Sequence, residues 1–218
     1  MLGQIPPITR ALLLSNGVIF MLQLLLGDIR FLDMMLWPLG EYSARVSAVS
    51  VVQVGFLPWQ VLTYGFLHGG LTHLFFNMFA LWMFGPALEG TWGSKRFMQY
   101  YLVCVIGAGL VQLVVATMAV NSGSPPYPTV GASGGIFGVL LAFGMLFPNH
   151  RLMLIFPPIP MRARTFVIVY GVLELVMGVT RTQSGVAHFA HLGGMAFGFL
   201  MIQYWRGRWP FRRRPRQG

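Results

Sequence analysis

The chain has 218 residues, of which 56% are hydrophobic and 9% are charged, and its formal net charge is +10. Soluble domains carry roughly 25% charged residues, so this chain cannot cover the surface of a globule in water, and lipid must be its main solvent. In a soluble protein the positive charge would suggest nucleic acid. Here the arginines gather at segment ends and in a tail, which indicates topology and anionic lipid and excludes nucleic acid as the partner.

Six apolar segments are long enough to cross roughly 30 Å of hydrocarbon at about 1.5 Å per helical residue. They lie near residues 11–27, 66–88, 97–120, 131–148, 164–180 and 185–205. We therefore predict an all-α polytopic membrane protein, with a membrane domain over 1–205 and a basic tail over 206–218. The start of the chain lacks the charged region and cleavage site of a signal peptide, so the first segment is expected to be retained.

A long segment, roughly 28–65, separates the first two predicted spans and contains Trp37, Pro38 and Trp59. Because tryptophan is favoured at the level of the lipid headgroups, we expect an interfacial first loop here rather than a span. Cys104, the only cysteine, lies in an apolar run, which excludes an internal disulfide and a CxxC metal site. We interpret Cys104 as a packing residue.

The distribution of Lys and Arg predicts the orientation of the chain. With six spans, one side of the membrane carries twelve of these residues and the other side carries three. The larger group is Arg10, Lys95, Arg96, Arg151, Arg162, Arg164 and the six arginines of the tail, and the smaller group is Arg30, Arg45 and Arg181. Because loops rich in Lys and Arg stay on the cytoplasmic side, both termini are expected to be cytoplasmic.

Small residues recur at intervals of four on two predicted spans. They are Gly134, Gly138 and Ala142 on the fourth, and Ala190, Gly194 and Gly198 on the sixth. This spacing places each set on one helical face and lets two backbones approach closely. The fourth and sixth spans are therefore predicted to be in contact.

Polar residues inside membrane spans are expensive, so they are candidates for function. The candidates are Ser133, His73, Asn77, His188, His191 and Glu174. At the helical rise, His73 and Asn77 lie about 10 and 16 Å into the second span, and His191 lies about 9 Å into the sixth. Ser133 begins the short fourth span. These groups are therefore expected to meet in the outer half of the membrane.

The chemistry of these residues fits acyl transfer. A serine hydroxyl becomes a nucleophile when a base removes its proton, and His191 is the expected base for Ser133. His73 and Asn77, four residues apart, share a helix face and can donate to one oxyanion, and the backbone N–H of Ser133 adds a third donor. Gly131 and Gly134 would permit the close approach that a side chain would block.

Two other functions compete for the same residues. His73, His188 and His191 could form the relay of a transporter or proton channel, which would show flux that survives the loss of Ser133. A histidine metal site is the other alternative. HExxH is absent, and His68 and His73 are five residues apart, which does not align them on one helix face, so we expect no metal and no cofactor.

Three motifs in chain order resemble the rhomboid intramembrane serine proteases: HGGLTHLFFN from His68, GASG from Gly131 and AHLGGMAFG from Ala190. GxSG alone is a weak signal, because many other hydrolases carry it. The resemblance covers nearly the whole chain from Trp59 onward. It implies a six-helix rhomboid bundle in which Ser133 is the nucleophile and His191 the general base, without a third acid.

The resemblance also implies roles for neighbouring residues. His73 and Asn77 match the pair that stabilises the oxyanion, and Phe137 stands where some members carry a tyrosine that stacks on the catalytic histidine. Gly131, Gly134 and Gly194 are expected to support this geometry. Gln60 replaces an arginine that several members pair with a glutamate like Glu89, which leaves open how the first loop is held. His68 is expected to support that loop.

Two polar residues have no matching role in the family. We interpret His188 as a polar residue lining the site. Glu174 reaches the depth of His191 and could orient it, but family precedent favours a satisfied or protonated structural glutamate on the fifth span, which is the mobile gate in rhomboids. A glutamate near such a gate could make activity depend on pH.

The implied activity is serine-type endopeptidase cleavage, within or near the membrane, of membrane-anchored substrates whose transmembrane segments unwind easily. A small residue is expected before the cleaved bond. The expected location is a bacterial inner membrane with the site open to the extracytoplasmic side. A non-catalytic rhomboid-like protein that binds transmembrane helices is the family alternative. No feature of the sequence requires a second copy of the chain.

Overall fold

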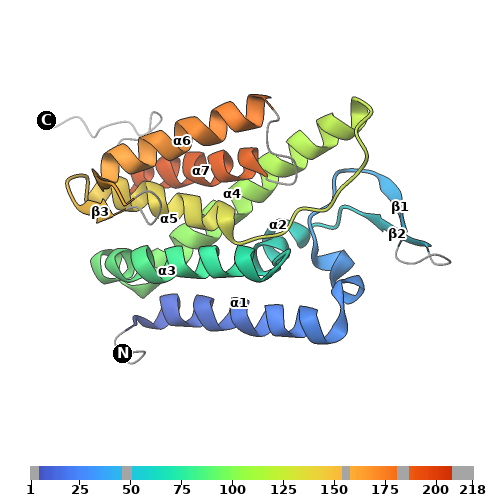
Figure 1. Ribbon diagram of the computed structural model, residues 1–218, viewed down its shortest axis with the longest axis horizontal. Helices are drawn as coiled ribbons and strands as arrows, with labels where there is room; N and C mark the ends of the chain where they lie inside the picture. The colour runs from blue at the N-terminus through green and yellow to red at the C-terminus, as the bar shows by residue number, and fades with distance from the viewer. Residues whose placement is uncertain (1–4, 46–50, 154–157, 181–186, 208–218) are drawn as a thin grey trace, which may run out of the picture.

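A computed structural model describes residues 5–45, 51–153, 158–180 and 187–207 of the chain. Each predicted span contains a helix, and these helices lie side by side in one bundle (Figure 1). They are α1 (Pro7–Leu26), α3 (Leu71–Trp92), α4 (Ser94–Asn121), α5 (Ser133–Leu146), α6 (Ala163–Thr180) and α7 (His188–Trp205). Arg181 and most of the predicted basic tail lie outside the described residues.

Four of these helices, α1, α3, α4 and α6, are long and apolar enough to cross a membrane. The apolar helix α5 has 14 residues, which corresponds to about 21 Å, and is shorter than the hydrocarbon layer. A short helix can begin below the membrane surface, as expected for the segment that starts with Ser133. The chain is thus an integral membrane protein, with four rather than six spans meeting the criteria of length and composition in its described part.

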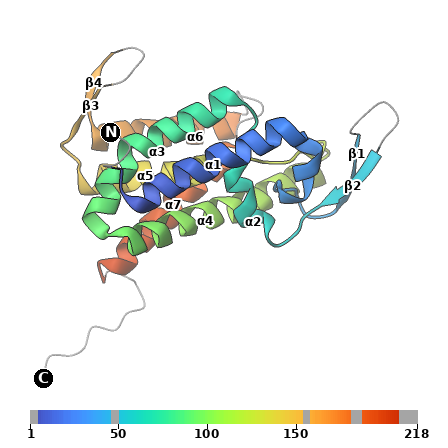
Figure 2. The same ribbon diagram turned by 90° about the horizontal axis from the view of Figure 1, so that it is seen from below.

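The first loop folds into short elements between α1 and α3. They are η2 (Asp28–Met34), the antiparallel strands β1 (Glu41–Arg45) and β2 (Val51–Gly55), α2 (Gln60–Thr63) and η3 (Tyr64–Phe66). A second hairpin, β3 (Arg151–Met153) with β4 (Pro160–Arg162), follows α5. The hairpins project from opposite ends of the bundle (Figures 1 and 2). The all-α prediction is therefore wrong in this detail, because two connections bond their own backbones as strands.

Gln60 holds the first loop together from a fully buried position. Its Nε2 donates to the backbone carbonyls of Gly55 and Asp33 at 3.0 and 3.3 Å. Its Oε1 accepts the backbone N–H of Trp37 at 3.1 Å. A neutral amide that both donates and accepts thus satisfies three backbone groups, and no ion pair with Glu89 is needed.

Glu89 lies near the last residue of α3, away from the first loop, and binds the start of α1. Its carboxylate accepts the backbone N–H groups of Ile8 and Thr9 at 2.9 and 2.8 Å, and the Ser94 hydroxyl at 2.6 Å. At the same end, the Trp92 ring lies against Trp205 of α7, with centroids 5.3 Å apart. The first residues of α1 and the last residues of α7 therefore lie at the same end of the bundle.

The long helix α4 forms the centre of the core. Tyr100, Tyr101 and Cys104 are completely buried, which confirms the prediction that Cys104 is a packing residue. The hydroxyl of Tyr100 donates to the backbone carbonyl of Gly138 at 2.7 Å, so α4 is bonded to α5 as well as packed against it. This core fixes the height of α5.

The predicted contact between the fourth and sixth spans is confirmed, and glycines make it possible. A Cβ atom on Gly194 of α7 would overlap the backbone carbonyl of Gly134 on α5. One on Gly138 would lie 3.3 Å from the carbonyl of Gly194 and would overlap the sulfur of Cys104. The backbones of α5 and α7 are therefore in direct contact at these glycines. This contact brings the first turns of both helices together.

Candidate active site

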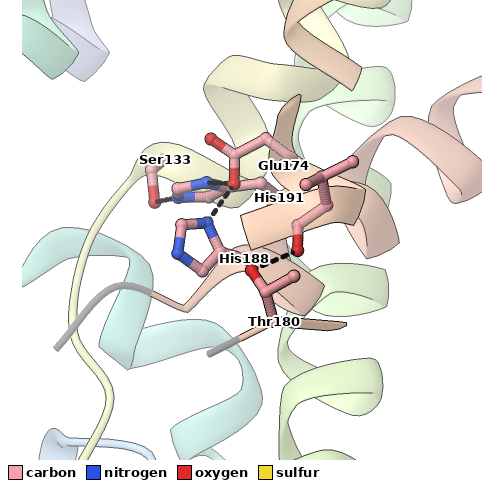
Figure 3. A network of polar contacts seen from close by, with 6 residues as sticks. Ser133, Glu174, Thr180, His188 and His191 are labelled. Carbon is pink, nitrogen blue, oxygen red and sulfur yellow. Dashed lines mark hydrogen bonds and ion pairs between the residues drawn. The ribbon is translucent and has the colours of Figure 1, made fainter. Parts of the chain in front are cut away.

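Ser133 and His191 face each other where α5 and α7 begin. Nε2 of His191 lies 2.7 Å from Oγ of Ser133, which is hydrogen-bonding distance for a base and the hydroxyl it would deprotonate (Figure 3). Ser133 is the first residue of α5, and His191 is 8% exposed in the first turn of α7. The predicted meeting of these two residues is thus present in the structure.

The site lies nearer the helix ends than the sequence suggested. The helix α3 begins at Leu71 rather than near residue 66, because Gly70 adopts a φ of +158° at its N-cap. His73 and Asn77 therefore lie about 3 and 9 Å from its start, instead of about 10 and 16 Å. Likewise α7 begins at His188, three residues later than predicted, so His191 lies about 5 Å along it.

The Phe137 ring covers His191, as predicted. The two rings are stacked, with centroids 4.2 Å apart and planes inclined by 7°. Phe137 follows Ser133 by one helical turn, so α5 supplies both the hydroxyl and the surface against which the imidazole lies. The helix α5 therefore contributes one hydrogen bond and one ring face to the position of the imidazole.

His73 and Asn77 of α3 line one cavity together with Ser133 and His191. A Cβ built on Gly131 would lie 2.8 Å from His73 Nε2 and 3.7 Å from Ser133 Oγ, so the missing side chain of Gly131 leaves the space between them. Gly131 has a φ of +133°, which other residues rarely adopt, and its N–H donates to the Tyr64 carbonyl at 2.9 Å.

Asn77 is buried, and its Nδ2 donates to the His73 carbonyl of its own helix at 2.9 Å. An amide nitrogen carries two hydrogens, so a second donor remains for another acceptor. The backbone N–H of Ser133, at the first position of α5, is not used by the helix. The spare N–H of Asn77 and the backbone N–H of Ser133 are thus candidate donors to the oxyanion expected from the sequence.

Glu174 and His188 complete a polar network behind His191. Oε2 of Glu174 lies 2.9 Å from Nδ1 of His191 and 2.7 Å from Nδ1 of His188. All three residues are buried, and Figure 3 shows one oxygen of the carboxylate joined to both imidazoles. The sequence predicted that Glu174 and His191 lie at the same depth in the membrane. It did not indicate that the faces of α6 and α7 that carry them are turned toward each other.

Within the described part of the chain, the same three residues form a group of side chains that could hold a metal ion. Their ligand atoms lie within 4.8 Å of one another, and two imidazoles with a carboxylate suit zinc. Both Nδ1 atoms are already engaged with Oε2 of Glu174, so the geometry is explained by hydrogen bonds within the protein. The pair considered from the sequence, His68 and His73, has a different arrangement, with rings in edge contact at 5.1 Å.

The backbone of His68 is bonded to Gln23 of α1, and the support of the first loop by His68 stays a prediction. Its backbone N–H donates to Oε1 of Gln23 at 3.0 Å, and its carbonyl accepts from Nε2 of the same side chain at 3.3 Å. His68 lies between η3 and α3 and is 2% exposed. Burial lowers the pKa of His68 to about 4, because a charged imidazole would lose its hydration there.

A cavity of about 1850 Å³ opens onto the site. It reaches Ser133, His191, His73, Asn77 and His188, and its walls are largely apolar. Phe75, Phe76, Phe79 and Met83 of α3 line it, and so do Phe166, Tyr170 and Met177 of α6. An apolar cavity with a few converging polar groups is the usual form of a binding site, and this one is large enough for a peptide segment.

The fold and the site define a helical integral membrane protein that carries a serine–histidine pair in a cavity among its helices. Residues 56–208 match the family model of the Rhomboid domain, which includes every residue of the site described above. The chain belongs to the rhomboid family.

Curated relatives agree with this assignment. The chain is 35% identical over 142 residues to rhomboid protease GluP of Bacillus subtilis, which covers 65% of this chain and 25% of that protein. It is 30% identical over 174 residues to Rhomboid protein 1, mitochondrial, of Saccharomyces cerevisiae, covering 78% and 49%. It is 31% identical over 154 residues to presenilin-associated rhomboid-like protein, mitochondrial, of Bos taurus, covering 66% and 39%. The chain thus spans between about a quarter and a half of the length of these relatives.

Proposed function

We propose that this protein is a serine endopeptidase that cleaves membrane-anchored proteins in or near their transmembrane segments, with Ser133 as nucleophile and His191 as general base. The observation that carries the proposal is the 2.7 Å contact between His191 Nε2 and Ser133 Oγ beside a large cavity. A histidine and a serine at this distance are the two parts that peptide hydrolysis through an acyl-enzyme requires.

The reaction proceeds in two halves. Ser133 Oγ attacks the scissile carbonyl carbon while His191 Nε2 takes the hydroxyl proton, and the carbonyl oxygen becomes an oxyanion. His73, Asn77 and the Ser133 N–H donate to that oxyanion. The C–N bond then breaks, and His191 returns the proton to the leaving amine. Water next attacks the ester, with its proton passing to His191 and from there to Ser133 as the acid leaves.

Residues 1–205 act in this proposal as one membrane unit with both termini cytoplasmic, and the bilayer and a membrane-anchored substrate as partners. In support, Arg10, Lys95 and Arg96 lie near the end of the bundle where α1 starts and α7 finishes, whereas Ser133 begins its helix at the other end. The positive-inside rule then directs the site to the extracytoplasmic side. With Cys104 replaced by alanine, treating cells that carry Ser124→Cys or Ser94→Cys with a membrane-impermeant thiol reagent tests this orientation, because only the first variant should react.

The cavity supports a membrane-anchored substrate. Its apolar walls on α3 and α6 suit a transmembrane segment, and its polar end at Ser133 suits an unwound peptide bond with a small residue before it. The relatives do not single out a membrane. GluP comes from Bacillus subtilis, but two of the relatives are named mitochondrial, so the expected bacterial inner membrane is not supported.

The test compares the wild-type protein with Ser133→Ala in liposomes that contain a single-span substrate. Wild type should cut the substrate and form a covalent adduct with a fluorophosphonate probe, and Ser133→Ala should do neither. A helix-binding protein without catalysis would give no cleavage and no adduct in either case. A transporter or channel would show flux that Ser133→Ala leaves unchanged.

A further inference from the structure

Glu174 is buried on a helix that otherwise faces outward. Most apolar side chains of α6 are exposed, and the other buried residues, Ala163 and Val167, lie near its start. Glu174 is 6% exposed, and an ionisable group in a membrane helix is costly unless it has partners. Its burial therefore has a specific cause, and the two histidines of α7 supply it.

The contacts connect Glu174 to the reacting atoms through one imidazole. Oε2 of Glu174 lies 2.9 Å from Nδ1 of His191, and Nε2 of the same ring lies 2.7 Å from Ser133 Oγ (Figure 3). An ionised carboxylate can only accept hydrogen bonds, so Nδ1 of His191 must donate. A neutral imidazole with its proton on Nδ1 has a bare Nε2, which is the atom that must accept the proton of Ser133.

We propose that Glu174 is a positioning residue for the reaction proposed above, holding His191 in the Nδ1–H tautomer and balancing the charge that His191 gains when it takes the serine proton. The inference rests on the proposed function of Ser133 and His191. It gives this protein a Ser133–His191–Glu174 triad in place of the dyad that the family resemblance implied.

His188 holds the carboxylate from its other side. Its Nδ1 lies 2.7 Å from the same Oε2, and its ring is nearly perpendicular to that of His191, at 86°. Two contacts to the same oxygen hold it more firmly than one could. The titratable groups that face His191 are thus Glu174 from α6, His188 from α7 and His73 from α3.

A purely structural glutamate would join α6 to α7 and would have no further effect on the reaction. The two roles differ in what a neutral replacement does. Glu174→Gln keeps the size and one acceptor oxygen, so it preserves the contact between the helices while it removes the charge. Glu89→Gln is the matched control. Glu89 is also buried and hydrogen-bonded, but it lies near the last residue of α3, away from His73 and Asn77 of the site.

The first experiment measures kcat and KM of the full-length protein against pH with a single-span substrate. We expect Glu174→Gln to lower kcat by about 10²- to 10⁴-fold with little change in KM, as loss of the acid does in soluble triads. The acidic limb of the pH profile should move to lower pH, because the imidazolium loses its counter-charge. Glu89→Gln should leave that limb in place. A Glu174→Gln variant within about twofold of wild type, with an unmoved limb, would overturn the proposal.

The second experiment reads the tautomer without requiring activity. In ¹⁵N-histidine spectra of the detergent-solubilised protein, assigned with His191→Asn, wild type should carry the His191 proton on Nδ1. Glu174→Met, which has no acceptor oxygen, should shift protons to Nε2. A wild-type proton on Nε2, or a Nδ1–H population unchanged in Glu174→Met, contradicts the role of Glu174 whether or not the protein cleaves substrate. Absence of cleavage and of a Ser133 adduct in wild type contradicts the proposed function instead.

Discussion

The backbone carbonyl of Gly134 occupies the space that a side chain on Gly194 would need. This relationship sets the separation of α5 and α7, and thereby the distance between Ser133 and His191. Ser133 and His191 lie within three residues of Gly134 and Gly194 in the sequence. A small displacement of α5 or α7 therefore changes the distance between the serine hydroxyl and the imidazole.

Replacing Gly194 with alanine should therefore separate the helices. We expect a loss of about 1–3 kcal/mol in unfolding free energy, the usual effect of overpacking, together with loss of cleavage. Thermal unfolding in detergent and a cleavage assay measure the two effects. Gly90→Ala is the matched control, since nothing lies within 4 Å of a Cβ at Gly90 in α3, and it should be as stable as wild type or more so. Equal behaviour of the two variants would contradict the close contact.

Replacing Gly131 with alanine should strongly lower the rate of cleavage. The new methyl group would lie 2.8 Å from His73 Nε2 and fill the space assigned to the oxyanion. The expected fall in kcat is about 10²-fold or more, as for loss of one oxyanion donor.

Gly123→Ala is the control for backbone strain. Gly123 also has a positive φ, +92°, but nothing lies within 4 Å of a Cβ there. It should keep nearly full activity in the same cleavage assay. If Gly123→Ala lost as much activity as Gly131→Ala, strain rather than the blocked space would be responsible.

Phe137 should matter for its ring rather than for its size. A stacked aromatic pair contributes about 0.5–1.5 kcal/mol, so Phe137→Leu should lower kcat by up to about tenfold. Phe137→Tyr keeps the ring over His191 and should retain most activity. The rate of fluorophosphonate labelling reports the reactivity of Ser133 directly. Equal labelling of the leucine and tyrosine variants would show that the stack has no effect.

Replacing Gln60 with alanine should destabilise the first loop. It would leave three backbone groups of that loop without their partner, and each buried polar group left unpaired costs about 1–3 kcal/mol. The unfolding midpoint should fall clearly. Gln53→Ala, which removes one exposed hydrogen bond in the β1–β2 hairpin, should change it little. Similar midpoints for both variants would mean that Gln60 does not hold the loop.

Acid should weaken the fold through His68. Its pKa is about 4 in the folded protein and about 6.5 when the chain is unfolded, so the unfolded state binds protons more readily. The stability contributed by neutral His68 is complete above about pH 6.5 and is lost as the pH falls toward 4. Unfolding midpoints between pH 7.5 and 4.5 should therefore fall more steeply for wild type than for His68→Gln. Parallel curves would exclude His68 as the cause.

The sequence alone determined the kind of protein and the residues with chemical potential. The informative patterns depend only on residue type and spacing. They are the apolar runs, the small-residue stripes that contain Gly134 and Gly194, and polar residues such as Ser133 and His191 within those runs. They can be interpreted because polar groups are costly in lipid. They predicted the contact of α5 with α7, and the resemblance to the rhomboid family implied the stack of Phe137 on His191; both are confirmed. The resemblance also marked Gln60 as a departure from the family's arginine, which left open how the first loop is held.

Only the tertiary structure decided which groups share a hydrogen bond. Depth along a helix follows from counting residues, but the face that α6 turns toward α7 depends on packing of the whole bundle. For that reason the sequence left open what Glu174 contacts, and the helix starts at Leu71 and His188 were predicted too early. A carboxylate between His188 and His191 is a relation between three side chains on two helices, and no local pattern in the chain encodes it.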